Sequence, residues 1–269
     1  MSLSFGIIQG RLTKAPKNRL QFFPRTINIE KEFSKAKQIG FDYVELFTER
    51  KFNPHNPIWN TKKSKFYKLL SKKYNLETPN LCDDFIILNN IRLKKNIFYL
   101  KRLIKNLKVN KIKNLILPLY GKSNMSDQNY LSFRNSLKDI TKFAKSLKIN
   151  ILIEANVSPE IFLYFKKHTK LNNFYFVFDT GNRINNGRNM LDDLSKIFKH
   201  IKIIHLKDKN DENKNVKFGR GNVNFKKIFK ILKKKRYKYK VTFESIRGVN
   251  PYVTARYNLL YFKRLIRKL

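Results

Sequence analysis

The chain has 269 residues, and its 42% share of hydrophobic residues is large enough to bury a sizeable core, which excludes a disordered chain. A single cysteine, Cys82, excludes a disulfide framework and a cysteine-rich zinc site, because both need several thiols. The 59 Lys and Arg residues exceed the 19 Asp and Glu residues, for a net charge of +40. The lysines are scattered over nearly every predicted helix, so we interpret much of this excess as compositional bias on a solvated surface.

No segment has the features of a secretory signal or a membrane span. The first residues lack a basic region, and no later stretch approaches the roughly 18 uninterrupted apolar residues that cross a bilayer. With a single thiol and no such segment, we expect a soluble, cytoplasmic protein in a reducing compartment.

Short apolar runs alternate with amphipathic stretches along the whole chain. The predicted strands are Ser4–Ile8, Tyr43–Phe47, Thr78–Cys82, Leu115–Leu119, Ile151–Ile153, Phe174–Phe178, Ile201–Leu206 and Lys240–Phe243. The predicted helices are Phe33–Ile39 before Gly40, Lys63–Lys73, Asn90–Leu107, Asp127–Leu147, Pro159–His168, Met190–Phe198, Phe225–Lys235 and Pro251–Leu269. Regular alternation of this kind predicts a parallel sheet connected by helices.

Eight strand–helix pairs in a chain close to the typical barrel length predict an α/β protein with one (β/α)8 TIM barrel domain over residues 1–269. An open doubly wound sheet is the competing architecture. Its phosphate-binding fingerprint is missing, because Gly219-Arg220-Gly221 lacks a third glycine and does not follow the first strand.

Four successive late strands end in side chains that bind metals. Glu154, Asp179, His205 and Glu244 each stand at or just after the end of a predicted strand. In a barrel these ends meet at the catalytic face, where three carboxylates would repel one another unless a cation held them. Each residue alone is better explained as a polar group satisfied by nearby backbone. The coincidence on four strands favours one divalent metal ion, Mn²⁺ first, with Mg²⁺, Co²⁺ and Zn²⁺ as alternatives.

Several segments together carry a family resemblance over nearly the full chain. They are Gly6–Leu12, Gln21–Pro24, Ile39–Glu45, Ile153-Glu154, Phe178–Asn182, His205-Leu-Lys-Asp208, Gly219–Phe225 and Phe243–Ser245. This pattern resembles the xylose isomerase-like TIM barrel superfamily, and within it the sugar phosphate isomerase/epimerase group. The resemblance implies a metal held by the four strand-end residues.

The resemblance also implies an acid/base pair, Glu154 and Glu244, that flanks the substrate. Removing a proton beside a carbonyl leaves an enediolate, and carboxylates on opposite faces would allow return of the proton from the other side. Ketose epimerases of the superfamily often carry a histidine three residues after the strand-six aspartate. Here that position is Asn182, which changes the expected substrate contacts of this loop.

The expected substrate is a small sugar or sugar phosphate. Candidates for binding its hydroxyl or phosphate groups are Gln9, Gln21, Arg11, Asn182, Lys207, Arg220 and Arg247. Arg220 ranks first for a phosphate, because its flanking glycines would let the backbone approach an anion. For Glu160 and Trp59 we favour structural roles, in the first turn of a helix and in the core.

Three alternatives stay open. The +40 charge keeps an apurinic-site endonuclease of the same superfamily in view, although four histidines are few for a three-metal nuclease site, so nucleic acid is disfavoured as a partner. A dehydratase of the same fold could use the same proton abstraction. A catalytically silent barrel is opposed by the intact set of ligands. A homodimer is a further expectation without a defined surface.

Overall fold

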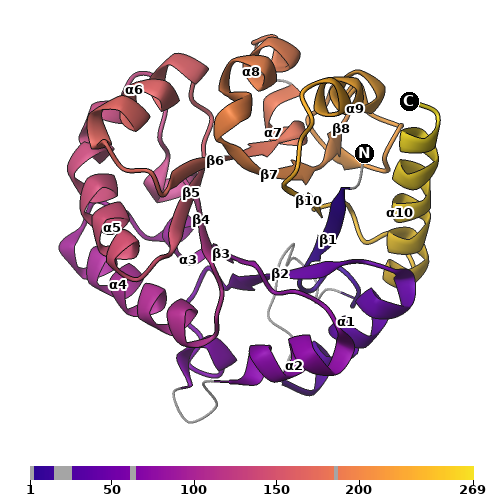
Figure 1. The fold of residues 1–269 in the computed structure, drawn as a ribbon, viewed down its shortest axis with the longest axis horizontal. Coiled ribbons are helices and arrows are strands. Elements are labelled where there is room, and N and C mark those ends of the chain that lie inside the picture. Colours follow the sequence, from indigo (N-terminus) through magenta and orange to yellow (C-terminus); the bar gives the residue numbers. More distant parts are fainter. Residues whose placement is uncertain (1–2, 15–25, 61–64, 185–186) are drawn as a thin grey trace. The chain divides into compact units, whose positions relative to one another are not determined.

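The computed structural model describes residues 3–14, 26–60, 65–184 and 187–269. Within these residues, eight parallel strands form a closed barrel in the order β1-β10-β7-β6-β5-β4-β3-β2, so the predicted fold class is confirmed (Figure 1). The strands are β1 (Ser4–Ile8), β2 (Tyr43–Thr48), β3 (Asn80–Asp83), β4 (Asn114–Pro118), β5 (Asn150–Glu154), β6 (Phe174–Asp179), β7 (Ile201–Leu206) and β10 (Lys240–Phe243). Two short antiparallel strands, β8 (Asp208–Lys209) and β9 (Asn215–Val216), were not predicted.

The helices follow the strands much as the apolar periodicity predicts. They are α1 (Thr26–Ile39), α2 (Phe66–Tyr74), α3 (Phe85–Leu88), α4 (Lys94–Val109), α5 (Arg134–Ser146), α6 (Pro159–Thr169), α7 (Thr180–Ile184), α8 (Met190–Ile197), α9 (Phe225–Lys234) and α10 (Pro251–Arg267). Short 3₁₀ helices at Pro57–Trp59, Gly121–Ser123, Tyr130–Phe133 and Phe198–His200 complete the described elements. Predicted positions Gln21 and Lys63 lie outside the described residues.

The helix predicted to begin at Asp127 begins instead at Arg134. Asn129 disrupts the start, because its side chain accepts a hydrogen bond from the Ser126 amide at 2.9 Å. The Ser132 hydroxyl then donates to the Asn129 carbonyl at 2.8 Å. Asn and Ser side chains compete with helical backbone hydrogen bonds in this way. The spacing of apolar residues, from which the helix was predicted, carries no information about this competition.

The contacts of the chain divide it into two compact units. The first unit contains Met1–Val44 and Phe178–Leu269, and the second contains Glu45–Val177. A single domain over residues 1–269 stays a prediction, and each unit is described by itself.

The core of the first unit includes a cluster of aromatic rings around Phe262 of α10. Its ring centroid lies between 4.9 and 5.3 Å from those of Phe218, Phe225, Phe229 and Phe243. The cluster joins α9, β10 and α10, and α10 also packs along α1 (Figure 1). Because aromatic side chains bury large areas, this cluster is a main source of stability for the unit.

The second unit contains a row of asparagine amides at the beginnings of its strands. Asn114 and Asn150 pair in register, and Asn150 Nδ2 donates to Asn114 Oδ1 at 2.8 Å. Asn114 Nδ2 donates to Asn80 Oδ1 at 2.7 Å, and Asn80 Nδ2 donates to Glu45 Oε2 at 3.2 Å. The amides thus form hydrogen bonds with one another across three neighbouring strands, which offsets the cost of removing their polar groups from water.

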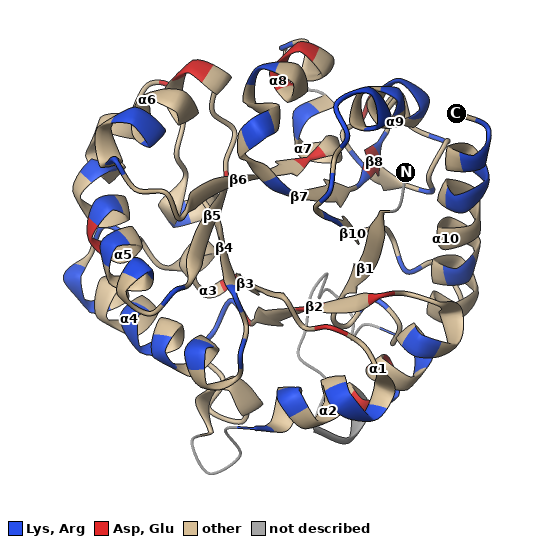
Figure 2. Cartoon of the chain, viewed as in Figure 1, with Lys and Arg blue, Asp and Glu red and all other residues tan. Residues whose placement is uncertain are grey.

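Basic residues recur on the outer helices of both units, whereas the strands carry few of them (Figure 2). The prediction of a solvated, dispersed charge agrees with this distribution. No helix among the described residues is both long enough and apolar enough to cross a membrane.

The Phe262 cluster gives a direct test of packing. We expect Phe262→Ala to lower the free energy of unfolding by about 3–5 kcal/mol, because a fully buried ring leaves a cavity. Tyr257→Ala on the same helix is the control, since Tyr257 is 59% exposed and should change stability by about 0.5 kcal/mol or less. Urea unfolding of both variants measures the difference, and equal losses would contradict the assigned role of the cluster.

Candidate metal centre

Asp179 is the last residue of β6, and the short helix α7 begins directly after it. Its Oδ1 accepts a hydrogen bond from the Asn182 amide at 2.7 Å, as a capping carboxylate does. Its Oδ2 lies 2.9 Å from Lys207 Nζ. The turn into α7 therefore fixes the carboxylate with one oxygen on the helix and the other on a buried cation. The predicted substrate contact of the Asn182 side chain stays a prediction.

His205 and Glu244 come from the neighbouring strands β7 and β10. His205 pairs in register with Thr242, and the Glu244 amide donates to the Leu206 carbonyl at 3.0 Å. This register brings His205 Nδ1 to 3.4 Å from Glu244 Oε2. Both side chains are buried, with His205 fully enclosed.

Glu244 is surrounded by cationic groups. Lys207 Nζ lies 3.1 Å from its Oε2, and Arg11 Nη2 lies 3.4 Å from its Oε1. Burial opposes ionisation, but the charges of Lys207 and Arg11 and the hydrogen bond with His205 outweigh it and hold the pKa of Glu244 well below its usual value. Glu244 is therefore a carboxylate at neutral pH, as a metal ligand or a general base must be.

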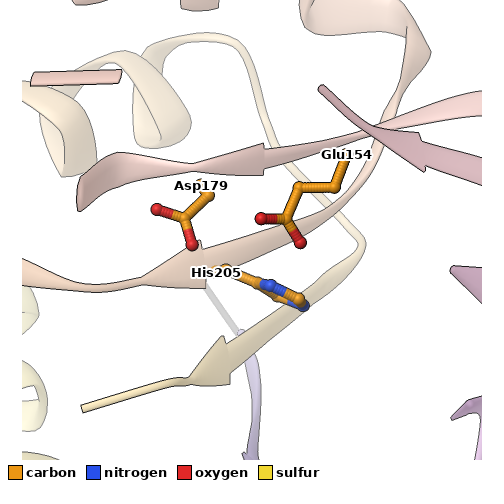
Figure 3. Close-up of side chains that lie close together, drawn as sticks. All are labelled: Glu154, Asp179 and His205. Carbon is orange, nitrogen blue, oxygen red and sulfur yellow. The ribbon is translucent and has the colours of Figure 1, made fainter. Parts of the chain in front are cut away.

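Glu154, at the end of β5, completes a cluster with Asp179 and His205 (Figure 3). Each of the three offers one ligand atom, and these atoms all lie within 4.8 Å of one another. All three residues are buried. Two carboxylates and one imidazole form a donor set that fits a divalent ion such as Mn²⁺, Mg²⁺, Co²⁺ or Zn²⁺. The cluster could thus hold a metal.

The loop after β1 carries Gln9 and Arg11 and is tied down by Glu32 of α1. Glu32 Oε2 accepts hydrogen bonds from the Gly10 and Leu12 amides at 3.0 and 3.2 Å. Arg11 Nη1 donates to the Ser245 carbonyl at 3.0 Å, beside its contact with Glu244. Gln9 is fully buried, and its side-chain amide has no hydrogen-bond partner within the described part of the chain. Glu32 was missed by the sequence analysis, because an acid on a surface helix carries no signal of its own.

Arg247 is bound to the same loop. Its Nε donates to the Gly10 carbonyl at 2.8 Å. Burial, with the nearby charge of Arg11, lowers the pKa of Arg247 to about 10, which still leaves it charged at neutral pH. Arg11 and Arg247 thus lie near one another, and their predicted substrate roles stay predictions.

The loop around Arg220 has a different organisation from the predicted phosphate site. The glycine amides on both sides of Arg220 donate to Asp208 Oδ2, Gly219 at 2.9 Å and Gly221 at 3.0 Å. The Val223 amide donates to Asp208 Oδ1 at 3.2 Å. A phosphate could bind these backbone amides only by displacing the Asp208 carboxylate. The flanking glycines therefore give no support to Arg220 as a phosphate-binding residue. The Arg220 side chain is exposed, and its role as a substrate contact stays a prediction.

The second unit contains a buried carboxyl that the sequence analysis missed. Asp83, at the end of β3, accepts hydrogen bonds from the Thr48 hydroxyl and, at 3.0 Å, from the Tyr99 hydroxyl. Burial raises the pKa of Asp83 to about 7, although both hydrogen bonds lower it. Tyr99 stacks on Phe85 and packs against Trp59, which is buried as expected. Only the fold brings these residues together, so a single sequence gives no sign of the group.

The fold and the strand-end cluster define a class of protein, a parallel (β/α)8 barrel with carboxylates and an imidazole at the ends of its strands. The xylose isomerase-like TIM barrel family matches residues 33–265. The chain therefore belongs to this family. A search of curated proteins returned no match.

Solved structures with similar folds include three sugar epimerases. A D-psicose 3-epimerase from Clostridium cellulolyticum H10 has 13% identity and a TM-score of 0.76, covering 98% of this chain and 99% of its own. A 3-keto-D-glucoside 4-epimerase from E. coli has 17% identity and a TM-score of 0.72, covering 98% and 100%. An L-ribulose 3-epimerase has 14% identity and a TM-score of 0.78, covering 99% and 95%. At such identities the likeness establishes the fold.

The raised pKa of Asp83 makes its contribution to stability depend on pH. Between the ordinary value of 3.8 and about 7, the folded carboxyl keeps a proton that the unfolded chain has lost, so stability falls as pH rises through this window. Asp83→Asn cannot ionise. Relative to wild type, it should therefore gain stability between pH 4 and pH 8, by roughly 4 kcal/mol at most.

Urea unfolding at both pH values measures this gain. Asp139→Asn is the matched control, because Asp139 is half exposed and pairs only with Lys101 among the ion pairs described, so its effect should change little with pH. A relative stability of Asp83→Asn that does not change with pH would refute the assignment.

Proposed function

We propose that this protein is a divalent-metal-dependent sugar or sugar-phosphate isomerase or epimerase. The observation that carries the proposal is the buried cluster of Glu154, Asp179 and His205 at strand ends of a xylose isomerase-like barrel. The three structural neighbours described above, which are all sugar epimerases, give further support.

The proposed metal ligands are Glu154, Asp179, His205 and Glu244. A bound divalent ion would supply Lewis acidity to the oxygen atoms of the substrate and stabilise the charge that develops when a neighbouring proton is removed. The donor set favours Mn²⁺, with Mg²⁺, Co²⁺ and Zn²⁺ as alternatives.

Glu154 and Glu244 are the proposed acid/base pair. Glu244 is ionised by its cationic surroundings and can accept a proton from the carbon next to a carbonyl. Glu154, in its protonated form, can deliver a proton to the opposite face of the enediolate and so invert the centre, whereas return of the proton by Glu244 to the original face gives no net change. A dehydratase would share the first step and differ in the loss of a hydroxyl group.

Substrate binding is proposed for Gln9, Arg11 and Arg247 on the loops after β1 and β10. The unsatisfied carboxamide of Gln9 suits a sugar hydroxyl, which can donate to and accept from it. Arg11 and Arg247 supply positive charge for a phosphate or a polarised oxygen. Asn182, Lys207 and Arg220 remain candidates from the sequence.

An apurinic-site endonuclease is the second candidate, favoured only by the +40 charge. A three-metal nuclease site needs several imidazoles, and His205 is the one histidine in the described cluster. His168 binds the Tyr164 carbonyl of its own helix at 2.9 Å and stacks on that ring, and His55 is exposed. Metal-dependent cleavage of abasic duplex DNA would reverse the ranking.

The acid/base pair is tested by exchange with solvent. Wild-type protein in deuterium oxide should incorporate deuterium next to the carbonyl of a substrate ketose, followed by NMR over a panel of ketoses and ketose phosphates. Glu154→Gln should retain its circular dichroism spectrum and lose exchange by a factor of about 10² or more. Glu160→Gln, six residues later in the first turn of α6, is the control and should exchange at a rate close to wild type. Normal exchange by Glu154→Gln would sink the mechanism.

The metal site is tested by elemental mass spectrometry on protein purified without chelator. We expect about one equivalent of a divalent metal in the wild type and a large loss in His205→Ala, which removes a ligand. His200→Ala is the control, because His200 ends a 3₁₀ helix before β7 and belongs to no described ligand group. Equal metal content in both variants would remove His205 from the site.

A further inference from the structure

Lys207 was a candidate site residue from the sequence, but its ion pairs with two carboxylates of the site were not foreseen. It follows β7 directly, and its side chain is only 8% exposed. Its ammonium group lies 2.9 Å from Asp179 Oδ2 and 3.1 Å from Glu244 Oε2. Two of the three N–H donors of Lys207 therefore face carboxylates that we propose as metal ligands. The ammonium group would have to leave these carboxylates to bind a substrate phosphate.

The backbone of Lys207 is held from both sides by Thr180. The Lys207 amide donates to Thr180 Oγ1 at 2.9 Å, and the same hydroxyl donates to the Lys207 carbonyl at 2.6 Å. This clamp joins the start of α7, next to Asp179, to the end of β7. The position of the lysine relative to the aspartate is thus built into the fold.

Gly181 makes room for the lysine side chain. A Cβ atom at this position would come within 2.7 Å of Lys207 Cγ and 2.9 Å of Lys207 Cδ, which is closer than real side chains approach. The lysine stem therefore lies directly over the glycine. Together the clamp and the glycine define a cradle that directs one cation onto two carboxylates.

We propose that Lys207 is a resident cation that holds Asp179 and Glu244 together and competes electrostatically with the divalent metal for them. The ammonium and the metal both gain from the same carboxylate oxygens, and they repel each other at the short distances of a buried site. This inference rests on the proposed function. It makes the metal of this protein less tightly held than the same ligands would hold it without the lysine, and it makes Lys207 a positioning residue.

The experiment is calorimetric titration of Mn²⁺ into chelator-treated protein at fixed pH and ionic strength. Lys207→Met keeps the length of the stem and removes the charge, and we expect it to bind Mn²⁺ at least about tenfold more tightly than wild type. Lys214→Met is the matched control. It removes the same charge from an exposed residue of the same unit that pairs with Glu212, and it should leave Kd within about twofold because surface charges are screened.

A second variant separates the position of the cation from its charge. Gly181→Ala keeps Lys207 but pushes its stem away, so its Kd for Mn²⁺ should fall in the same direction as that of Lys207→Met. It also gives the test if Lys207→Met does not fold. A thermal shift adds a readout without metal, because metal-free Lys207→Met should melt below wild type and recover when Mn²⁺ is added.

The outcomes separate this inference from the metal site itself. Binding of Mn²⁺ by both proteins, with the tighter binding in Lys207→Met, would support the inference. Equal or weaker binding by Lys207→Met, with clear binding by wild type, would overturn it and leave the proposed metal site standing. If none of the proteins binds Mn²⁺, both the metal site and the competition fail.

Discussion

Mutual repulsion of buried carboxylates is the constraint on which this site depends. Asp179 and Glu244 are enclosed by protein, and an isolated ionised carboxylate in such a place is costly without a compensating charge. The protein supplies that charge with Lys207 and, on the other side of Glu244, with Arg11. Asp179 also accepts a hydrogen bond from the Asn182 amide, and Glu244 lies close to His205. The low pKa of Glu244 is the direct consequence.

This arrangement extends outward through hydrogen bonds to backbone. Thr180 sets the place of Lys207. Asp208 accepts hydrogen bonds from three loop amides, those of Gly219, Gly221 and Val223, and Glu32 accepts from the Gly10 and Leu12 amides. Three acidic or hydroxyl side chains thereby fix the strand-end loops, which would otherwise be free to vary in conformation. Preorganised loops hold the charged groups in place without a cost in ordering when a substrate arrives.

Much of the fold can be predicted from the sequence, because strand and helix periodicities are local. The eight barrel strands begin and end within two residues of their predicted bounds, and the strand-end positions of Glu154, Asp179, His205 and Glu244 follow directly from them. The directions of long side chains are not local. The ion pair of Lys207 with Asp179 could not be read from the sequence, and its predicted substrate contact stays a prediction. The Gly219 and Gly221 amides likewise donate to Asp208 across a loop.

The same reasoning explains why the buried group around Asp83 escaped prediction. Thr48, Asp83 and Tyr99 lie on three separate elements, and each residue type is common at such positions. Their meeting raises a pKa to about 7, but the cause is burial, which depends on the packing of Phe85 and Trp59 around them. A sequence pattern records polarity and spacing, whereas the energy of a buried charge depends on what surrounds it in three dimensions.

The net charge of +40 looks at first like the dominant electrostatic property of this protein, yet it has little influence on the site. Surface charges in water are screened over about 8–10 Å at physiological salt, and many of the Lys and Arg residues lie on outer helices (Figure 2). Lys207 and Arg11 are few but buried, and they contact Glu244 directly. Interactions at 3 Å in a site of low dielectric constant far exceed those of distant, solvated charges. Two buried cations therefore control the ionisation of the site more strongly than the whole basic surface does.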